Sequence, residues 1–308
     1  MSLKVDMRVS LGPLELRNPV MTASGTFGSG REYADFVALD RLGAVVTKGV
    51  SPEAWEGSPG ARIAETASGM LNSIGLQNPG VEEFAGRDLA WLASHAPEAT
   101  VIVNVSGHTV GEYVRVIERL EAEPNVHGYE LNISCPNVDE GGMAFGVDCV
   151  RAAEVTEACR RATRRCVIVK LSPNVTDIAS IATTVEAAGA DAVSLINTLL
   201  GMSIDAQTAR PRLGRVVGGL SGPAIKPIAL RMVWQVASAV KIPIVGMGGI
   251  MTGTDAVEFM LAGATAVAVG TASFVDPAAT LRVLDGLEGY CTSKGIERVS
   301  GLTGALKA

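Results

Sequence analysis

The stretch from Val167 to Ile196 contains the pattern that decides the fold. Val167-Ile168-Val169-Lys170-Leu171 and Ala192-Val193-Ser194-Leu195-Ile196 are short, mostly apolar runs, and between them Ile178–Ala188 has the periodicity of an amphipathic helix that ends before Gly189. Runs that are apolar on both faces are typical of strands in a parallel sheet covered by helices. A glycine directly after a helical pattern is a common helix stop signal. We therefore expect a strand–helix–strand unit here.

The same alternation extends in both directions from this unit. Eight strands are expected, at Val20–Ser24, Ala44–Lys48, Val101–Val105, Tyr129–Ile133, Val167–Leu171, Ala192–Ile196, Ile244–Met247 and Ala266–Val269. Helical patterns lie between them, at Glu112–Glu121, Val150–Arg164, Ile178–Ala188, Ile225–Ala239 and Thr254–Leu261. No low-complexity linker divides the chain. The sequence thus predicts an α/β fold, a (β/α)₈ TIM barrel, with residues 1–308 as a single domain.

Composition excludes several classes of protein. The chain has 308 residues, 47% of them hydrophobic, and a net charge of -6 with acids and bases mixed throughout. Such a chain buries a large core, and it has no basic stripe for nucleic acid or anionic lipid. No apolar run reaches the roughly 20 residues that span a bilayer, and the first residues lack the apolar stretch of a signal peptide. We expect a cytoplasmic protein whose partners are small molecules or proteins.

The cysteines argue against metal and disulfides in this chain. Their positions, 135, 149, 159, 166 and 291, are odd in number and show neither C-x-x-C nor cluster spacing. Disulfides, structural zinc and iron–sulfur ligation are therefore not expected. Cys135 differs from the others because it follows a predicted strand and precedes a glycine-containing loop. A cysteine is most often a small buried hydrophobe, but one at a strand end is open to reactants.

Polar residues lie at or just after the ends of six of the predicted strands, at the end of the barrel where active sites form. They are Ser24, Lys48 with Gly49, Asn104, Asn132 with Cys135, Lys170 with Ser172, and Asn197 with Thr198. Each alone could cap a backbone group in a loop. Together they indicate a polar ligand, because unpaired buried polar groups cost about 1–3 kcal/mol each.

The last two strands end in glycines instead. Gly246-Met247-Gly248-Gly249-Ile250 and Gly270-Thr271 allow backbone N–H groups to approach an anion, and Gly222 before another helix is expected to line the same pocket. This pattern predicts a phosphate site. Gly25-Thr26-Phe27-Gly28-Ser29-Gly30 runs in the reverse of the Rossmann order, so it does not indicate a dinucleotide site.

Three interpretations of the site follow from these residues. A phosphate-bearing cofactor, a lysine near it and a thiol on a facing loop compose a redox site, and flavin mononucleotide (FMN) fits that arrangement. The alternatives are a flavin-free barrel lyase or isomerase of a phosphorylated metabolite, which uses Lys48 or Lys170, and a catalytically inactive barrel that serves as a protein-binding scaffold.

Five ordered motifs carry a family resemblance over nearly the whole chain. They are Asn132-Ile133-Ser134-Cys135-Pro136-Asn137, Asn72-Ser73-Ile74-Gly75-Leu76-Gln77-Asn78-Pro79-Gly80, Lys170-Leu171-Ser172-Pro173-Asn174, Ile196-Asn197-Thr198 and Gly218-Gly219-Leu220-Ser221-Gly222-Pro223-Ala224-Ile225-Lys226-Pro227. These motifs resemble those of class 1 dihydroorotate dehydrogenases. The sequence pattern of residues 196–227 is most similar to that of the class 1B catalytic subunit. The resemblance implies FMN-dependent oxidation of dihydroorotate to orotate in de novo pyrimidine (UMP) biosynthesis.

The resemblance also implies roles for individual residues. Cys135 is expected to be the base that removes a proton while hydride passes to flavin N5, and Lys48 to contact both substrate and flavin. The implied substrate-binding residues are Lys48, Asn72, Ser73, Ile74, Gly75, Leu76, Asn132, Asn137, Asn197 and Thr198. The implied flavin-binding residues are Ser24, Lys48, Gly49, Asn104, Asn132, Lys170, Ile196, Gly222, Gly248, Gly249, Gly270 and Thr271.

Class 1B further implies a partner protein. A homodimer core is expected to be joined by a subunit that carries FAD and a [2Fe–2S] cluster and that reduces NAD. This chain lacks cluster-spaced cysteines and a Rossmann fingerprint of its own. The alternative is class 1A, in which a small acceptor such as fumarate reaches the same pocket.

Overall fold

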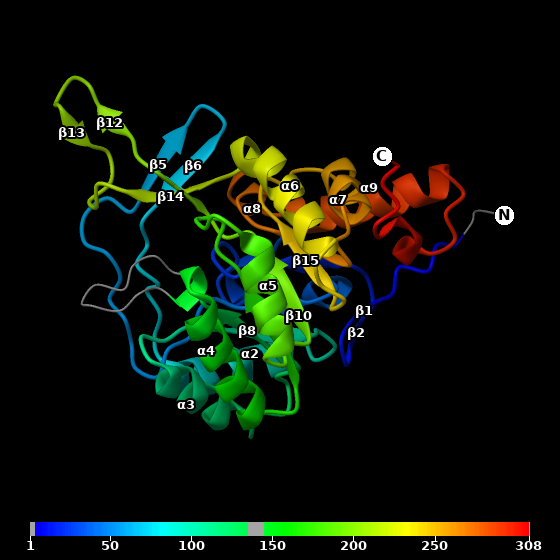
Figure 1. The fold of residues 1–308 in the computed structure, drawn as a ribbon, viewed down its shortest axis with the longest axis horizontal. Coiled ribbons are helices and arrows are strands. Elements are labelled where there is room, and N and C mark those ends of the chain that lie inside the picture. Colours follow the sequence, from blue (N-terminus) through cyan, green and yellow to red (C-terminus); the bar gives the residue numbers. More distant parts are fainter. Residues whose placement is uncertain (1–3, 135–144, 308) are drawn as a thin grey trace.

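A ring of parallel strands forms the centre of the computed structural model, which describes residues 4–134 and 145–307 (Figure 1). The eight-stranded sheet runs in the order β3, β16, β15, β10, β9, β8, β7, β4. The strands are β3 (Val20–Thr22), β4 (Val45–Val46), β7 (Val101–Val105), β8 (Gly128–Asn132), β9 (Cys166–Lys170), β10 (Ala192–Leu195), β15 (Ile244–Met247) and β16 (Ala266–Val269).

The ring closes between β3 and β4. Met21 bridges Ala44 in parallel, and the Thr22 hydroxyl accepts from Val46 N at 2.8 Å. Every predicted strand is present, and the expected (β/α)₈ barrel is confirmed. The assignment of residues 1–308 to a single domain stays a prediction.

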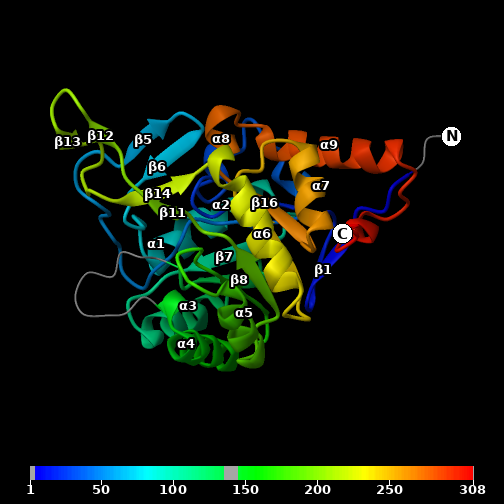
Figure 2. The ribbon, with the colours of Figure 1, turned by 45° about the horizontal axis from the view of Figure 1, so that its top comes forward.

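Helices surround the barrel, as Figures 1 and 2 show. The predicted ones are α3 (Val110–Leu120), α4 (Cys149–Ala162), α5 (Ile178–Ala187), α6 (Lys226–Ala237) and α7 (Gly253–Leu261). Their starts follow from the sequence, because Asp177 caps α5 and Thr252 forms a capping box with Asp255 at α7. Not predicted were α1 (Val81–Glu83), α2 (Ala90–His95), α8 (Ala272–Val275) and α9 (Ala279–Ser293), together with a π turn at Phe84–Leu89 and 3₁₀ turns at Arg31–Tyr33, Leu39–Arg41, Phe145–Val147, Pro223–Ile225 and Val299–Leu302.

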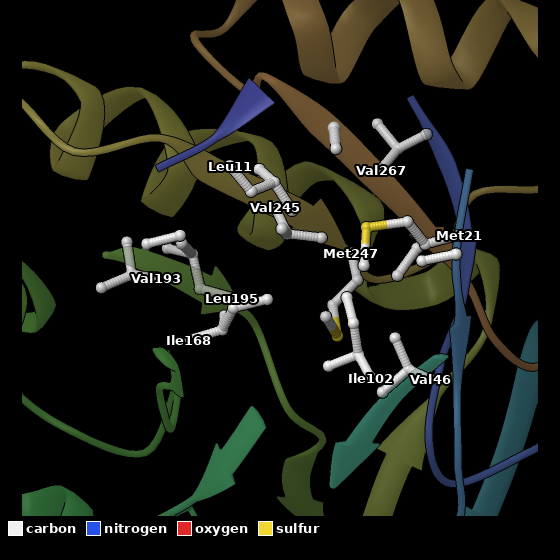
Figure 3. Close-up of a cluster of buried hydrophobic side chains, with 14 of the residues drawn as sticks. Leu11, Met21, Val46, Ile102, Ile168, Val193, Leu195, Val245, Met247 and Val267 are labelled. Carbon is white, nitrogen blue, oxygen red and sulfur yellow. The ribbon is translucent and has the colours of Figure 1, made fainter. Parts of the chain in front are cut away.

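Apolar side chains from strands around the ring form a buried core (Figure 3). Ile102, Ile168, Leu195, Val245 and Val267 are all at most 1% exposed. Burying a side chain of this size contributes about 1.5–3 kcal/mol. The barrel is therefore a rigid support for the loops at its ends.

An antiparallel hairpin lies at the amino-terminal end of the barrel strands. It pairs β1 (Val9–Leu11) with β2 (Leu14–Leu16). Cys166, the first residue of β9, donates its thiol to Leu11 O at 3.3 Å. The hairpin covers the end of the barrel opposite the predicted site.

A second, small sheet lies at the other end and was not predicted. Its order is β11 (Leu199–Gly201), β14 (Gly218–Ser221), β6 (Gly69–Asn72), β5 (Ile63–Thr66), all antiparallel. It is built from the segments that follow β4 and β10, and the β12 (Ile204–Asp205) and β13 (Arg210–Pro211) hairpin projects beyond it (Figure 1). We call this four-stranded sheet the roof.

The described residues contain neither a candidate membrane span nor a candidate metal centre. No helix among residues 4–134 and 145–307 is both long and apolar enough to cross a membrane. In that same part of the chain, no group of three or more His, Cys, Asp or Glu side chains is arranged to hold a metal ion.

Candidate active site

A cavity of about 710 Å³ lies between the carboxyl ends of the barrel strands and the roof. It gathers most of the residues that the sequence singled out. These are Ser24, Lys48, Gly49, Asn72, Ile74, Gly75, Leu76, Asn104, Asn132, Lys170, Ile196, Asn197, Thr198, Gly222, Gly248, Gly249, Gly270 and Thr271. Their individual roles stay predictions.

Among the described residues, one predicted residue does not line the cavity. Ser73 is buried beside the cavity at 3% exposure, and its hydroxyl has no partner among the described residues. Cys135 and Asn137 lie outside the described residues. The position of the predicted base relative to the cavity therefore stays a prediction.

Buried polar side chains form the floor of the cavity. Lys170, at the end of β9, is 5% exposed and donates from Nζ to the Ser24 hydroxyl at 3.2 Å. Asn104, from β7, is 1% exposed and donates from Nδ2 to Glu130 Oε2 at 2.6 Å. The Asn104 Oδ1 atom is buried and has no partner among the described residues, so its capacity to accept a hydrogen bond is unused there.

A chain of hydrogen bonds orients the amides on one wall. Asn197 Nδ2 donates to the Ser134 hydroxyl at 2.6 Å, and that hydroxyl donates to Asn132 Oδ1 at 2.8 Å. Asn197 Oδ1 accepts from Thr198 N at 2.8 Å. This arrangement leaves the Asn132 NH₂ group as a donor. Asparagines held in this way present fixed donors and acceptors without a charge to desolvate.

Asn72 adds an amide from the roof, where its Nδ2 donates to Gly219 O at 3.2 Å. The neighbouring loop, with Ile74, is fixed by Ser58 N, which donates to Ile74 O at 2.9 Å. The cavity thus receives amides from both the barrel and the roof.

Lys48, at the end of the segment that contains β4, supplies a second cation. Its side chain is half-buried, and its backbone N donates to Gly28 O at 2.7 Å. Burial lowers the pKa of the Lys48 ammonium from 10.5, while the nearby Glu32 raises it and Arg62 lowers it further. A desolvated cation of this kind attracts an anionic ligand strongly.

Glycines line the far side of the cavity. Gly248 and Gly249 have φ of +122° and +80°, a region that favours glycine. A Cβ on Gly249 would lie 2.8 Å from Lys226 Cβ and 2.9 Å from Gly222 O, so no side chain fits there. Gly222 precedes the helical turn Pro223–Ile225 that leads into α6. The first turn itself offers no free peptide N–H, because Pro223 has none, Ala224 N donates to Ser68 O at 2.9 Å and Ile225 N donates to Gly222 O at 3.1 Å.

Sequence reasoning missed several lining residues. Glu32 and Tyr33 come from a 3₁₀ turn, Met70 from the roof, Met251 from the loop after β15, and Phe274 from α8. Glu130, which lies beneath the floor, was also missed, because the strand that contains it is mostly apolar. Its charge in the middle of that strand was the signal that could have identified it.

Comparisons with known proteins agree on one family. A family model described as dihydroorotate dehydrogenase matches residues 7–290. A protein of Alkaliphilus metalliredigens named dihydroorotate dehydrogenase B (NAD(+)), catalytic subunit, is 56% identical over 303 residues, which cover 98% of this chain and 99% of the relative. A protein of the same name from Trichlorobacter lovleyi is 56% identical over 305 residues, covering 99% and 100%.

A solved structure shares the fold at lower identity. It is described as a crystal structure of DHODH in complex with ferulenol from Eimeria tenella. The TM-score is 0.81 at 22% identity, with 98% of this chain and 89% of that chain covered. At this identity the likeness supports the barrel architecture alone.

Proposed function

The chain belongs to the dihydroorotate dehydrogenase family, and we propose that it is a type B catalytic subunit that oxidises dihydroorotate to orotate in pyrimidine biosynthesis. The observation that carries this proposal is the cavity, which brings two lysines and four asparagines together opposite a glycine-lined wall. A pyrimidine dione with a carboxylate requires amide donors and acceptors and a cation. A flavin phosphate requires free backbone N–H groups.

FMN is the cofactor that these residues fit. Gly222, Gly248, Gly249, Gly270 and Thr271 would hold its phosphate, because four of these five residues have no side chain to keep a phosphate away from the backbone. The unpartnered Asn104 Oδ1 gives the floor an acceptor, and Lys170 gives it a positive charge. When bound, FMN supplies the acceptor for a hydride.

The substrate would lie against the amide wall. Asn132, Asn197 and Asn72 meet the edge of the pyrimidine, and their hydrogen bonds within the protein fix which atoms each presents. Lys48 binds the carboxylate. Because the lysine is partly desolvated, pairing with an anion offsets the cost of its burial.

We assign the removal of the substrate proton to Cys135 because of the family motif in which it lies. A thiolate at this position removes a proton from the ring methylene, and the carbon beside it loses hydride. Positioned general bases contribute about 10²–10⁴-fold to such reactions.

Electrons leave through a partner protein in this proposal. The relatives are named as catalytic subunits of an NAD(+) enzyme, which supports a second subunit for the present chain. We propose that this partner carries FAD and a [2Fe–2S] cluster, that it joins a homodimer of this chain in the cytoplasm, and that NAD is the final acceptor.

Anaerobic titration of the FMN-loaded chain tests the function. Dihydroorotate is expected to bleach the oxidised flavin band. Dihydrouracil, which lacks the carboxylate that Lys48 would bind, is the matched control and should bleach it much more slowly. Equal bleaching by both compounds would contradict the substrate assignment.

The acceptor is tested separately with the isolated chain. It should pass electrons from dihydroorotate to an artificial dye but not to NAD, because the proposed dinucleotide site belongs to the partner. Reduction of fumarate as fast as the dye would instead indicate the type A reaction.

A further inference from the structure

Glu130 is a buried carboxylate beneath the cavity. It lies in the middle of β8, is 3% exposed, and does not line the cavity itself. Its Oε2 atom accepts from Asn104 Nδ2 at 2.6 Å, and its Oε1 atom accepts from the Ser194 hydroxyl at 2.7 Å. Lys170 Nζ lies 4.0 Å from Oε2. Glu130 thus contacts two residues of the cavity floor.

The strand register places Glu130 one layer below that floor. Glu130 pairs with Asn104 on β7, whereas Lys170 pairs with Asn132, two residues further along β8. Alternate residues of a strand point to the same face, so Glu130 and Asn132 share a face of β8. Asn132 reaches the cavity and Glu130 lies deeper in the barrel.

Stability alone does not explain a charge at this depth. The surrounding interior is apolar, with Ile102 and Ile168 at most 1% exposed. Desolvating a carboxylate and an ammonium is costly, and replacing such a pair with apolar residues is often neutral or stabilising. A buried pair that touches a ligand site therefore suggests a role in the site.

Glu130 also fixes the orientation of an amide. An ionised carboxylate only accepts hydrogen bonds, so Asn104 must turn its NH₂ group toward Glu130. The Asn104 Oδ1 atom then points away, lies 3.0 Å from where a Cβ on Gly49 would be, and has no partner among the described residues. Glu130 thereby makes Asn104 an acceptor at the floor.

We propose that Glu130 is a positioning residue for the flavin. Its carboxylate holds Lys170 and Asn104 in place, and it offsets the positive charge that Lys170 presents. This inference rests on the proposed function. The carboxylate does not touch the flavin in this proposal but acts through its two neighbours. Its charge is expected to make the floor less favourable to the anionic reduced flavin than Lys170 alone would be.

The test is the midpoint potential of FMN bound to Glu130→Gln. Glutamine keeps the shape of the side chain and removes its charge, so Lys170 is no longer offset. The reduced flavin should gain about tenfold or more in binding relative to the oxidised form, which raises the potential of a two-electron couple by about 30 mV or more. An unchanged potential in a variant that binds FMN would overturn the proposal.

Glu121→Gln is the matched control. Glu121, like Glu130, accepts two hydrogen bonds, here from the hydroxyls of Tyr129 at 2.9 Å and Thr163 at 2.7 Å, and it lies 3.6 Å from Arg165 Nε. It follows α3 and does not line the cavity. The same chemical change there should leave the flavin potential at the wild-type value. An equal shift in both variants would also overturn the proposal, because the effect would then not depend on the floor.

A second pair of variants covers the case in which Glu130→Gln does not fold. Lys170→Met is compared with the double variant Lys170→Met, Glu130→Gln, in which no buried charge is left unpaired. The double variant should have the higher potential, and equal potentials would contradict the proposal. If the wild-type chain binds no FMN or is not reduced by dihydroorotate, the proposed function fails instead, so the two failures are distinguishable.

Discussion

Replacing Gly219 by alanine should weaken orotate binding without releasing FMN. Gly219 lies in β14 of the roof and lines the cavity. A Cβ there would lie 2.0 Å from Thr198 Oγ1 and 2.7 Å from Thr198 Cβ, far inside contact distance. Thr198 must therefore move. Asn72 Nδ2 lies 3.4 Å from the same Cβ and donates to Gly219 O, so we expect the Asn72 side chain to shift as well.

The expected loss of orotate affinity follows from the hydrogen bonds that the substitution would remove. A typical hydrogen bond contributes about 0.5–1.5 kcal/mol net, so losing those of Thr198 and Asn72 to the ligand costs about 1–3 kcal/mol. This corresponds to an orotate Kd raised about 5-fold to 150-fold. The floor of the cavity, where the flavin is proposed to bind, should be unaffected. No atom of Lys170 or Asn104 is among those nearest to the added Cβ.

The assay is titration of the FMN-loaded variant with orotate, followed by the change in flavin absorbance. Gly289→Ala is the control, since a Cβ at this position in α9 meets nothing within 4 Å. It should leave the orotate Kd unchanged and stabilise the protein by about 0.5–1 kcal/mol, because alanine favours a helix. A wild-type orotate Kd in Gly219→Ala would refute the steric reasoning.

Three further predictions address the base, the cation and the core. Cys135→Ser should slow flavin reduction by dihydroorotate about 10²–10⁴-fold in stopped-flow experiments while FMN stays bound, and wild-type speed would remove this residue from its role. Orotate affinity should fall as the pH rises through the pKa of Lys48, which burial lowers from 10.5, because the neutral amine no longer attracts the carboxylate. Lys48→Arg should extend binding to higher pH, and a Kd that is constant up to pH 10.5 would contradict the assignment. Phe259→Ala, at a fully buried position of α7, should lower the free energy of unfolding in urea by about 3–5 kcal/mol, and a loss below about 1 kcal/mol would mean that the cavity collapses.

The barrel could be predicted because its information is local. Each strand is a short run buried on both faces, and its neighbour in the sheet is usually the next strand along the chain. The carboxyl ends of such strands meet at one edge, so Asn104, Asn132 and Lys170 could be placed together before any coordinates were known. Their convergence on one cavity follows from topology alone.

The roof could not be predicted for the opposite reason. It pairs Asn72 with Gly219, residues 147 positions apart, and its strands are only three or four residues long. Such strands are stabilised by partners that are distant in sequence, which local patterns do not reveal. Glu130 was missed for another reason. The run that contains it is mostly apolar, so it was interpreted as an apolar strand and its one charged residue was not considered part of the site.

The long-range pairing of the roof also sets the order in which the site can assemble during synthesis. β6 leaves the ribosome well before β14, and Gly270 and Thr271 follow later still. Because a domain generally folds as a unit, and a strand pair can form only when both strands exist, β6 cannot pair with β14 until β14 has been made. If Gly270 and Thr271 hold the FMN phosphate as proposed, a nascent chain is expected to retain the cofactor only after these residues have been translated. Flavin retention would distinguish finished from truncated chains in the cell.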